Sequence, residues 1–270
     1  GSVTWGLPLN IVSTVALDRF DLDAYVPKTA SAAPPPAVPS AVAPVAPSKP
    51  DEKAPVLGMK ARVAKLVYRG ETLNGVDADV SLQGNLLKLN GLKVADLLGA
   101  KLDLKGQIAD FGTDPRFDLT FATSMPDTDK LLVYAGLPKF INGKIGAATA
   151  TGGVVGTMGA VTVRNVAVTM AGATARATGS LVLGDNFAFD FPSFGLQARD
   201  ASQLVSVATG RAQSGIGGVE AAGAFKGNEK NISFEGNLTA MRTPMIGRIE
   251  AGLADRPTIV ANLRIPGTLD

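Results

Sequence analysis

The residues best suited to chemistry are two closely spaced pairs of aspartates, Asp21 with Asp23 and Asp127 with Asp129. Paired carboxylates can act as a general acid and base, and they can also bind calcium. The chain contains no histidine and no cysteine. This composition excludes histidine-based triads, His-ligated metal sites, thiol chemistry and disulfides. Carboxylate, lysine or serine chemistry would have to carry any catalysis.

The aspartates recur in a frame that is repeated along the chain. The frame reads Asp-x-(Asp/Ser)-x-(Tyr/Leu)-(Val/Leu), and its third copy begins at Asp200, 73 residues after Asp127. Asp127 or its neighbour Thr128, and likewise Asp200, could accept hydrogen bonds from the free amides of a first helical turn. Gly136 and Gly210 stand where these helices would end. We therefore interpret the aspartates as helix caps and predict three short helices, with no catalytic or metal site.

A proline-rich segment accounts for a longer first interval between the copies. Asp21 and Asp127 are 106 residues apart, which is 33 more than the next interval. Residues 28–57 hold eight of the 17 prolines and show no periodicity that a core would require. Proline has no amide hydrogen and disfavours helix at the residue before it, so an extended, solvated spacer is predicted. The alternative is a polyproline ligand for a partner domain.

Other residues follow the same period. Gly106, Gly179 and Gly252 are spaced by 73 residues, and phenylalanine-rich stretches precede the second and third copies of the frame. A repeat of this length indicates a supersecondary unit. The predicted organisation is the end of a preceding repeat at 1–27, the spacer at 28–57, and three repeat units at 58–137, 138–210 and 211–270, the last of them truncated.

Apolar and polar residues alternate along most of the remaining chain. Val76, Ala78 and Val80, for example, alternate with Asp77 and Asp79. A period of two with one polar face indicates a half-buried antiparallel strand. Pairs of glycine with asparagine or aspartate, at 84–85, 90–91, 184–185 and 227–228, favour tight hairpins between such strands. The pattern predicts four strands per unit and an extra strand at about 61–69, about thirteen in all.

Charge and composition narrow the function classes. The formal net charge is +2, aromatic residues make up 6% of the chain, and lysine and arginine are spread over the strands. Nucleic-acid binding would need a basic stripe or a stacking platform, and neither is visible. The chain also has no run of about 20 apolar residues, the length that a membrane-spanning helix requires.

The order of these segments resembles the periplasmic part of AsmA-family proteins. The resemblance begins with LDRFDLDAYVP at 17–27 and the spacer directly after it. It continues with GVDADVSLQGNLLKLNGLKVADLLGAKLDLKGQI at 75–108 and FDLTFATSMPDTDKLLVYAG at 117–136, and it covers essentially the whole chain. The family is related to TamB-type bridge-like lipid transfer proteins. It implies a periplasmic protein of outer-membrane biogenesis, neither an enzyme nor a cofactor binder, anchored in the inner membrane by a segment outside this chain.

The resemblance implies phospholipid or another membrane lipid as the ligand, carried between the inner and outer membranes. Outer-membrane assembly proteins are further candidate partners, and nucleic acid is not expected. The strand pattern supports a lipid ligand independently, because three short helices cannot cover the apolar faces of about thirteen strands. Acyl chains could fill such a face, since they demand apolar area rather than specific hydrogen bonds.

The predicted fold is mainly β, with repeated antiparallel strands that form a curved, open β-groove with short capping helices. The predicted lining residues of the groove lie on the apolar faces of these strands. They are Val80, Leu82, Leu87, Leu89, Leu102, Leu104, Phe117, Leu119, Phe121, Val161, Val163, Phe187, Phe189, Phe191, Ile232, Phe234, Ile259 and Leu263.

Two other functions are compatible with parts of the pattern. A β-sandwich, in which two sheets bury their apolar faces against each other, would alternate in the same way. Such a module would have a structural role, or would modulate outer-membrane protein assembly, without a ligand. An enzyme that acts on envelope polymers is the third possibility, and it lacks a clustered set of catalytic residues.

Overall fold

The structure is a computed structural model that describes residues 1–4, 9–25, 53–111, 114–135, 143–184, 186–252 and 258–267. Most of the predicted spacer at 28–57, and the predicted helix stop at Gly136, lie outside these residues. The two described helices contain eight residues each, and neither is long and apolar enough to cross a membrane.

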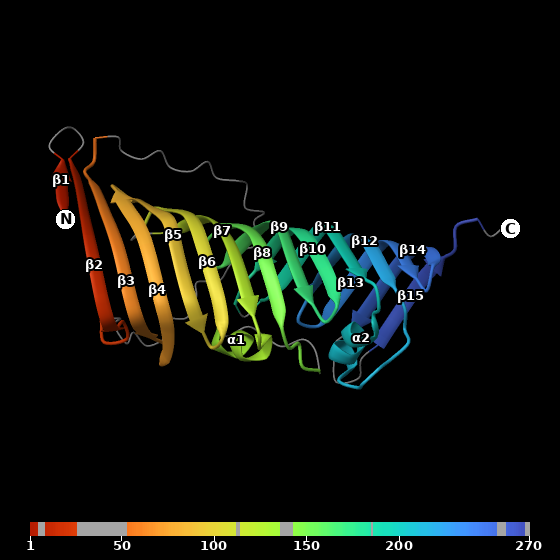
Figure 1. Cartoon of the computed structure of the whole chain (residues 1–270). Coiled ribbons are helices and arrows are strands. Elements are labelled where there is room, and N and C mark those ends of the chain that lie inside the picture. The colour runs from red at the N-terminus through yellow and green to blue at the C-terminus, as the bar shows by residue number, and fades with distance from the viewer. Residues whose placement is uncertain are drawn as a thin grey trace. The chain divides into compact units, whose positions relative to one another are not determined.

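Fifteen strands and two helices make up the described structure (Figure 1). The elements before the first helix are β1 (Ser2–Thr4), β2 (Asn10–Asp21), β3 (Val56–Tyr68), β4 (Glu71–Gln83), β5 (Leu86–Leu97), β6 (Ala100–Ala109) and β7 (Arg116–Met125). They are followed by α1 (Thr128–Ala135), β8 (Ala148–Gly156), β9 (Ala160–Met170), β10 (Ala173–Val182), β11 (Ala188–Ala198), α2 (Ser202–Thr209), β12 (Val219–Asn228), β13 (Asn231–Ala240), β14 (Thr243–Gly252) and β15 (Thr258–Arg264).

The strands form one open sheet whose hydrogen-bonded neighbours follow the order of the chain from β1 to β15. This confirms the predicted mainly β fold with repeated strands in an open sheet. It is a single sheet, not the two packed sheets of a sandwich. Hairpins explain most of this order, because a strand that follows a tight turn lies beside the strand that precedes the turn.

One strand pair departs from the predicted antiparallel arrangement. β2 and β3 run parallel, with Asn10 opposite Val56 and Asp21 opposite Val67. Parallel neighbours need a crossover connection of a dozen or more residues, and residues 22–55 supply it. The extra residues of the first interval between frame copies therefore fall within this crossover. Alternation alone could not reveal the direction of β2, since parallel and antiparallel strands both have a period of two.

The chain divides into two compact units. The N-terminal unit comprises residues 1–123 with 154–159, and the C-terminal unit comprises residues 124–153 with 160–270. Strands β1 to β6 lie in the first unit, and both helices and β9 to β15 lie in the second. These compact units are a different kind of division from the predicted repeat units at 58–137, 138–210 and 211–270, which stay a prediction.

Two predicted element boundaries are wrong. β3 begins at Val56, inside the predicted spacer and five residues before the expected start at 61. Alternation already starts at Leu57, two residues after Pro55. The first copy of the frame was expected to open a helix. Residues 22–25 form a turn instead, and Asp23 binds the β3–β4 turn with its carboxylate.

Tight turns mark a repeat that is not strictly periodic. Both central residues have positive φ in the turns at Leu98-Gly99, at Ala171-Gly172 and at 241–242, as in the primed turns of hairpins. These turns are 73 and then 70 residues apart. The predicted third glycine, Gly252, therefore does not occupy the position equivalent to Gly106 and Gly179, and it ends β14.

Gly247 takes the place that the 73-residue period assigned to Gly252. A Cβ on Gly106, Gly179 or Gly247 would lie 2.1, 2.0 or 1.9 Å from a carbonyl oxygen of the neighbouring strand. No side chain fits at any of the three positions. The shared feature is thus a close approach of two backbones, which the sequence period alone located correctly only twice.

Glycines also form a row across three strands of the C-terminal unit. Gly223 of β12 pairs with Gly236 of β13, which pairs with Gly247 of β14. A Cβ on Gly236 would lie 2.3 Å from the carbonyl oxygen of Ala222 and 2.6 Å from the Cα of Gly223. The strands therefore approach along this row more closely than any side chain would permit.

Candidate functional site

Cross-strand pairing gathers the apolar residues of β3 to β6 on one face of the N-terminal unit. Val63 pairs with Val76, Val76 with Val94, and Val94 with Leu102. The three valines are 3–8% exposed and form the centre of a hydrophobic cluster. Directly paired residues share a face, so neighbouring rows extend the same surface.

We call this surface the N-terminal apolar face. It contains leucine, valine, alanine, isoleucine, methionine and one glycine, and it carries no charged residue. Its members in β3 to β6 are Leu57, Met59, Ala61, Val63, Val76, Ala78, Val80, Leu82, Leu87, Leu89, Leu92, Val94, Leu102, Leu104, Gly106 and Ile108.

The six predicted lining residues between Val80 and Leu104 all lie on the N-terminal apolar face. Val80 pairs with Leu89 and Leu82 pairs with Leu87. Leu102 pairs with Val94, and Leu104 with Leu92. In β7, alternation places the predicted Phe117, Leu119 and Phe121 together on one face, with exposed Thr120 and Ala122 on the other.

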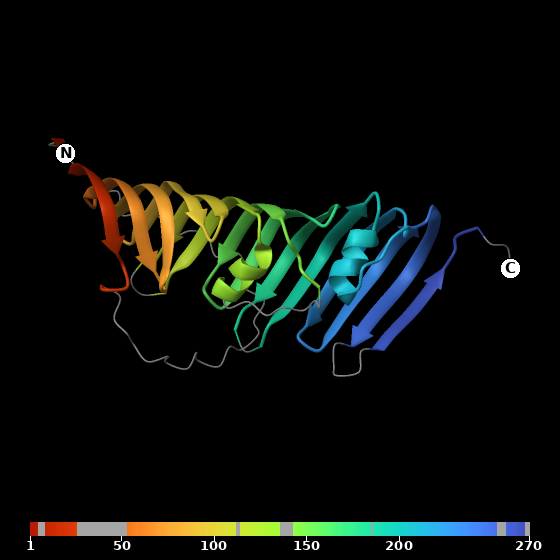
Figure 2. The same cartoon turned by 60° about the horizontal axis from the view of Figure 1, so that its bottom comes forward.

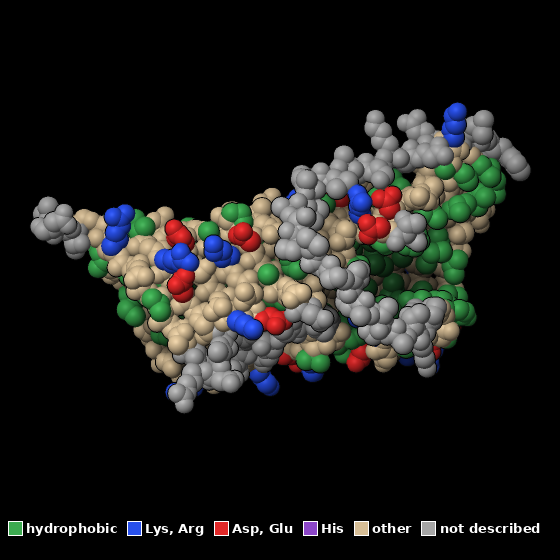
Figure 3. All heavy atoms as spheres, turned by 180° about the vertical axis from the view of Figure 1, so that it is seen from behind, with side chains coloured by type: hydrophobic (Ala, Val, Ile, Leu, Met, Phe, Trp, Pro, Cys, Tyr) green, Lys and Arg blue, Asp and Glu red, His purple; other side chains and the backbone are tan. Residues whose placement is uncertain are grey.

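The N-terminal apolar face is not covered by the described residues. Leu57 is 46% exposed and Met59 is 41% exposed, and across the described residues no large side chain is fully buried. Seen from behind, the N-terminal unit has a hollow whose walls are hydrophobic side chains (Figure 3). A folded sandwich would bury these residues, so the face is open to a ligand.

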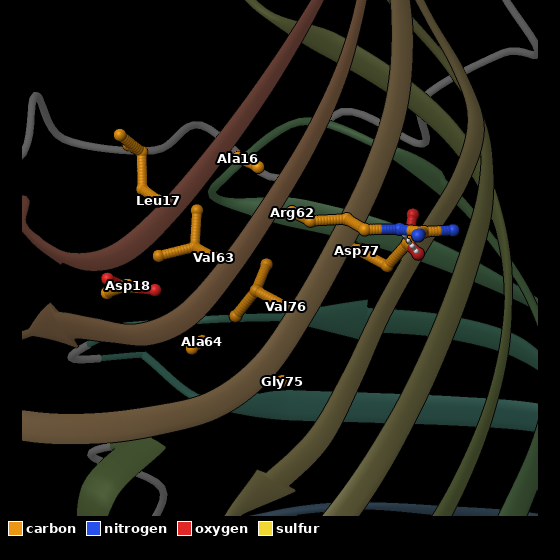
Figure 4. Close-up of a pocket in the computed structure, with 9 residues that line it drawn as sticks. All are labelled: Ala16, Leu17, Asp18, Arg62, Val63, Ala64, Gly75, Val76 and Asp77. Carbon is orange, nitrogen blue, oxygen red and sulfur yellow. Dashed lines mark hydrogen bonds and ion pairs between the residues drawn. The ribbon is translucent and has the colours of Figure 1, made fainter.

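The opposite face of the same strands is charged. Arg62 of β3 forms an ion pair with Asp77 of β4 at 3.1 Å. The next cross-strand pair on this face is Lys60 with Asp79, at 3.6 Å. Figure 4 shows Val63 and Val76 side by side, while Arg62 and Asp77 point away from them and meet each other. The sheet therefore separates an apolar face from a solvated one.

The C-terminal unit builds its apolar face from phenylalanine and glycine. Phe189 lies 5.3 Å from Phe191 and 4.9 Å from Phe225, measured between ring centroids. Phe194 lies 4.9 Å from Phe225 and 6.3 Å from Phe234. Phe187 adds a sixth ring, 6.2 Å from Phe189. We call these six rings the phenylalanine cluster.

Two rings of this cluster lie opposite glycines. Phe189 pairs with Gly227 and Phe194 pairs with Gly223 in the neighbouring strand. A Cβ on Gly227 would lie 2.9 Å from the ring of Phe189, so this ring occupies the space that a side chain would otherwise fill. Large rings and absent side chains together keep the surface continuous.

The cluster belongs to a larger surface, the C-terminal apolar face. Like its counterpart it carries no charged residue. Its members in β11 to β14 are Phe189, Phe191, Phe194, Leu196, Ala198, Val219, Ala221, Gly223, Phe225, Gly227, Ile232, Phe234, Gly236, Leu238, Ala240, Met245, Gly247, Ile249 and Ala251.

The remaining predicted lining residues extend the C-terminal apolar face on both sides. Val161 pairs with Leu181, which pairs with Phe189, and Val163 pairs with Gly179. On the other side Ile259 pairs with Ala251, and Leu263 pairs with Gly247. Sequence alternation therefore placed these residues on the face to which cross-strand pairing assigns them.

Helix α2 covers only one end of this face. Leu204 of α2 packs with Leu196 and Val219 against the buried Ala173 and Ala198. The helix lies at the lower ends of the neighbouring strands in Figure 1, and Figure 2 is turned so that this end comes forward. The phenylalanine cluster lies further along the strands, and the structure shows no helix over it among the described residues.

Each copy of the repeated frame binds the backbone of a segment that follows it in the chain. The amide after the first aspartate donates to a backbone carbonyl in every copy. Leu22 donates to Val67, Thr128 to Gly146 and Ala201 to Gly217, at 2.8–2.9 Å.

The aspartate or serine two residues after the first aspartate adds a second hydrogen bond to a nearby segment in each copy. Asp23 accepts from the Arg69 and Gly70 amides at 2.7 and 2.8 Å. Asp129 accepts from the Ile145 amide at 2.9 Å, and the Ser202 hydroxyl from the Ile216 amide at 3.1 Å. Because three copies use the position in the same way, this second carboxylate or hydroxyl ties a loop in place.

The predicted capping role of the first aspartate holds only in part, because the N-cap residue of α2 is Ala201, which receives no side-chain cap hydrogen bond. Asp200 accepts the Ser202 hydroxyl at 2.6 Å and the Ser202 amide at 2.9 Å, whereas the contact of Asp127 with the Lys130 amide is long, at 3.4 Å. These hydrogen bonds from the hydroxyl and the amide lower the pKa of Asp200. Gly210 ends α2 in the left-handed conformation, with φ of 72°.

Sequence reasoning missed the centre of each apolar face. Val63, Val76 and Val94 form the buried cluster of the first unit, and Phe194 and Phe225 belong to the phenylalanine cluster of the second. The same alternation could have identified Val63 in residues 57–63, and it had already placed Val76 on the apolar face of a strand, although Val76 was not among the predicted lining residues. Phe194 follows a proline at 192, where the register shifts, so simple alternation does not place it.

No group of three or more acidic side chains that could hold a metal ion occurs among the described residues. The apolar faces offer area but no acid, base or nucleophile. No protein-family model, curated protein or solved structure matched the chain.

Proposed function

We propose that the protein is a non-enzymatic, AsmA-like periplasmic protein that holds or conducts phospholipid acyl chains along its apolar sheet faces. In this proposal it contributes to outer-membrane biogenesis by carrying lipid between the inner and outer membranes. A further segment outside this chain would anchor it in the inner membrane. The resemblance in the order of the frame, the spacer and the strands supports this assignment.

The observation that carries the proposal is the exposure of large apolar side chains on a single open sheet. Leu57 and Met59 are more than 40% exposed, although their face carries no charge. Leaving so much apolar surface in contact with water costs free energy at about 25 cal/mol for each Å². A ligand that covers this surface would recover that free energy.

The chemistry of both faces fits acyl chains better than other ligands. Neither face carries a charged side chain that could bind a headgroup or a polar metabolite. Acyl chains need only apolar area, and they can shift along such a face because no directional hydrogen bond fixes them. The charged face of β3 to β6 would keep the opposite side of the sheet in water.

A lipid assay with two matched variants tests the proposal. The chain is purified without detergent from bacteria that have two membranes, and organic extracts are analysed by mass spectrometry. We expect phospholipid to copurify with the natural chain. Leu104→Glu, which places a carboxylate on the N-terminal apolar face, is expected to reduce the bound phospholipid at least severalfold, and Lys105→Glu, on an exposed neighbouring residue, is expected to leave it unchanged.

Circular dichroism must show that both variants remain folded. Leu104 is only half-buried, so a carboxylate at this position can reach water. A folded natural chain that carries no phospholipid would contradict the proposal. Equal phospholipid in the Leu104→Glu and Lys105→Glu variants would contradict it as well, because binding would then not involve the apolar face.

A further inference from the structure

The face of the C-terminal unit opposite its apolar face contains a polar hollow, which crosses the four neighbouring strands β10 to β13. The volume of the hollow is about 280 Å³. Its floor consists of Gly195 in β11 and Ala222 in β12, which are direct cross-strand partners. Because neither residue has a side chain beyond Cβ, the surface is lowered there across two strands.

Nothing in the backbone requires a glycine at position 195. The nearest contact of an added Cβ would be the carbonyl oxygen of Ala221 at 3.8 Å, an ordinary van der Waals distance, and Gly195 does not have a positive φ. Gly223, Gly236 and Gly247 differ, since a Cβ on each would lie 2.3 Å or less from a carbonyl oxygen. A glycine inside a strand costs stability, and it often marks a place where a ligand approaches the backbone. The open space above Gly195 therefore indicates a binding site.

Two charges of opposite sign border the hollow. Arg176 of β10 is the direct partner of Gly195, and Glu220 of β12 lies two residues before Ala222. Neither side chain forms an ion pair with a residue that the structure describes. Glu220 accepts a hydrogen bond from Nε2 of Gln197 at 3.0 Å, and this bond occupies only Oε1 of its carboxylate. Both charged groups are thus available to a ligand.

Neutral polar side chains complete the rim. Asn237 of β13 is the direct partner of Ala222, and Thr174 and Thr239 border the hollow from β10 and β13. Amides and hydroxyls can both donate and accept hydrogen bonds, as the peptide group does. The residues that line the hollow include no aromatic side chain, so the site suits a hydrophilic ligand.

We propose that this hollow binds a small zwitterionic ligand, a peptide of about two residues with a free amine and a free carboxylate. Arg176 holds the carboxylate, because a guanidinium group can donate two parallel hydrogen bonds to it. Glu220 accepts hydrogen bonds from the ammonium group. Strands β10 and β12 are two strand spacings apart, about 9–10 Å, and an extended dipeptide spans about 7 Å between the two side chains. The inference does not depend on lipid binding.

Dialanine tests the need for both charges, in comparison with its N-acetylated and its C-amidated form. NMR spectra of the chain, labelled at alanine and threonine methyl groups, report binding at Ala222 and Thr174. We expect saturable shifts with dialanine and about fivefold weaker binding of each blocked form, which is the upper range for one exposed ion pair. Glucuronic acid has a carboxylate but no amine, so it should bind as weakly as N-acetyl-dialanine.

Two charge variants assign the ends of the ligand. Arg176→Gln should weaken the binding of dialanine about fivefold and should leave that of the amidated form unchanged. Glu220→Gln should weaken dialanine similarly and leave the acetylated form unchanged. Arg248→Gln is the control on the same face, because Arg248 is already paired with Glu250, and it should bind dialanine as the natural chain does. Equal weakening of all three peptides by Arg176→Gln would contradict the assigned carboxylate contact.

Filling the floor tests the site without changing its charge. Gly195→Val should be at least as stable as the natural chain in urea, because valine favours strands and a Cβ fits there, yet it should lose detectable binding. Ala222→Leu, at an exposed position, should block the same space. The proposal is refuted if the folded natural chain gives no saturable shift, or if blocked peptides or glucuronic acid bind as well as dialanine. Natural affinity in either folded floor variant would refute it as well.

Discussion

The two units present apolar faces of the same kind with different residues. Strands β3 to β6 use branched aliphatic side chains, with Val63, Val76 and Val94 buried at the centre. Strands β11 to β14 use the phenylalanine cluster and the glycine row instead. Neither face includes a charged residue, although the opposite face of β3 to β6 carries a ladder of ion pairs.

This difference shows that a continuous apolar surface can be built in two ways. Branched side chains fill the N-terminal face evenly, and each contributes a small part of the stability of the unit. In the C-terminal unit the backbones approach closely at glycines, and a few large rings cover the space. Glycine and ring positions should therefore tolerate substitution poorly in the second unit, whereas loss of stability should be spread more evenly in the first.

The largest effect is expected at the glycine row. Gly236→Val would place a Cβ 2.3 Å from the carbonyl oxygen of Ala222, and a backbone atom cannot move aside as a side chain can. We expect a loss of more than about 4 kcal/mol in the free energy of unfolding, measured by urea denaturation. Gly91→Ala in β5 is the control, since nothing lies within 4 Å of its added Cβ. An equal loss in both variants would show that the close approach is not decisive.

The next effect is expected in the phenylalanine cluster. Phe189 contacts three other rings and covers Gly227, so Phe189→Ala should cost about 3 kcal/mol of unfolding free energy. Val94→Ala in the N-terminal unit should cost about 2 kcal/mol, because a smaller group is removed from a site that is 3% exposed. Urea denaturation of both variants checks the order. The contrast between the units fails if Val94→Ala is the more damaging of the two.

Acid is expected to weaken the start of α2. The folded pKa of Asp200 is lowered by hydrogen bonds from the Ser202 hydroxyl and amide. Its carboxylate therefore stabilises the fold above the unfolded pKa of about 3.9, and this contribution is lost as the pH falls through the folded pKa. Asp200→Asn should lower the melting temperature at neutral pH, and the difference from the natural chain should shrink in acid. A difference in melting temperature that does not change with pH would show that the charge of Asp200 does not stabilise the fold.

The smallest effect is expected on the charged face of the N-terminal unit. Arg62 and Asp77 are largely exposed, so a double-mutant cycle with Arg62→Ala and Asp77→Ala should give a coupling of about 0.5 kcal/mol. Added salt should reduce this coupling, because exposed charges are screened. A coupling above about 2 kcal/mol would show that this face also determines the stability of the unit.

Alternation along the chain predicted the fold and much of the candidate site. Val80, Leu82, Leu87 and Leu89 pair across β4 and β5 on one apolar face, because a period of two fixes the face of every residue once one is known. Hairpin signals predicted tight turns between consecutive strands, and the observed strand order agrees with such turns. Turn residues act locally, and chain neighbours therefore become sheet neighbours.

Features that depend on two distant segments could not be predicted. The parallel pairing of β2 with β3 joins residues on either side of a long connection, and nothing in either strand encodes direction. The binding of Asp129 to the Ile145 amide also needs the folded loop, so its carboxylate resembled a simple cap in the sequence. The position of Phe194 depends on a shift of register that single-strand alternation does not contain.

Site-specific photo-crosslinking tests most directly whether the apolar faces hold lipid. A photoreactive phenylalanine analogue is placed at Leu92 or Phe234 on the two apolar faces, or at the adjacent Lys93 or Glu235 on the opposite faces. After irradiation in cells and purification, mass spectrometry is expected to find phospholipid attached at Leu92 and Phe234 and not at Lys93 or Glu235. Equal labelling of both faces, or no labelled lipid at either apolar position in a folded chain, would contradict lipid binding by these surfaces.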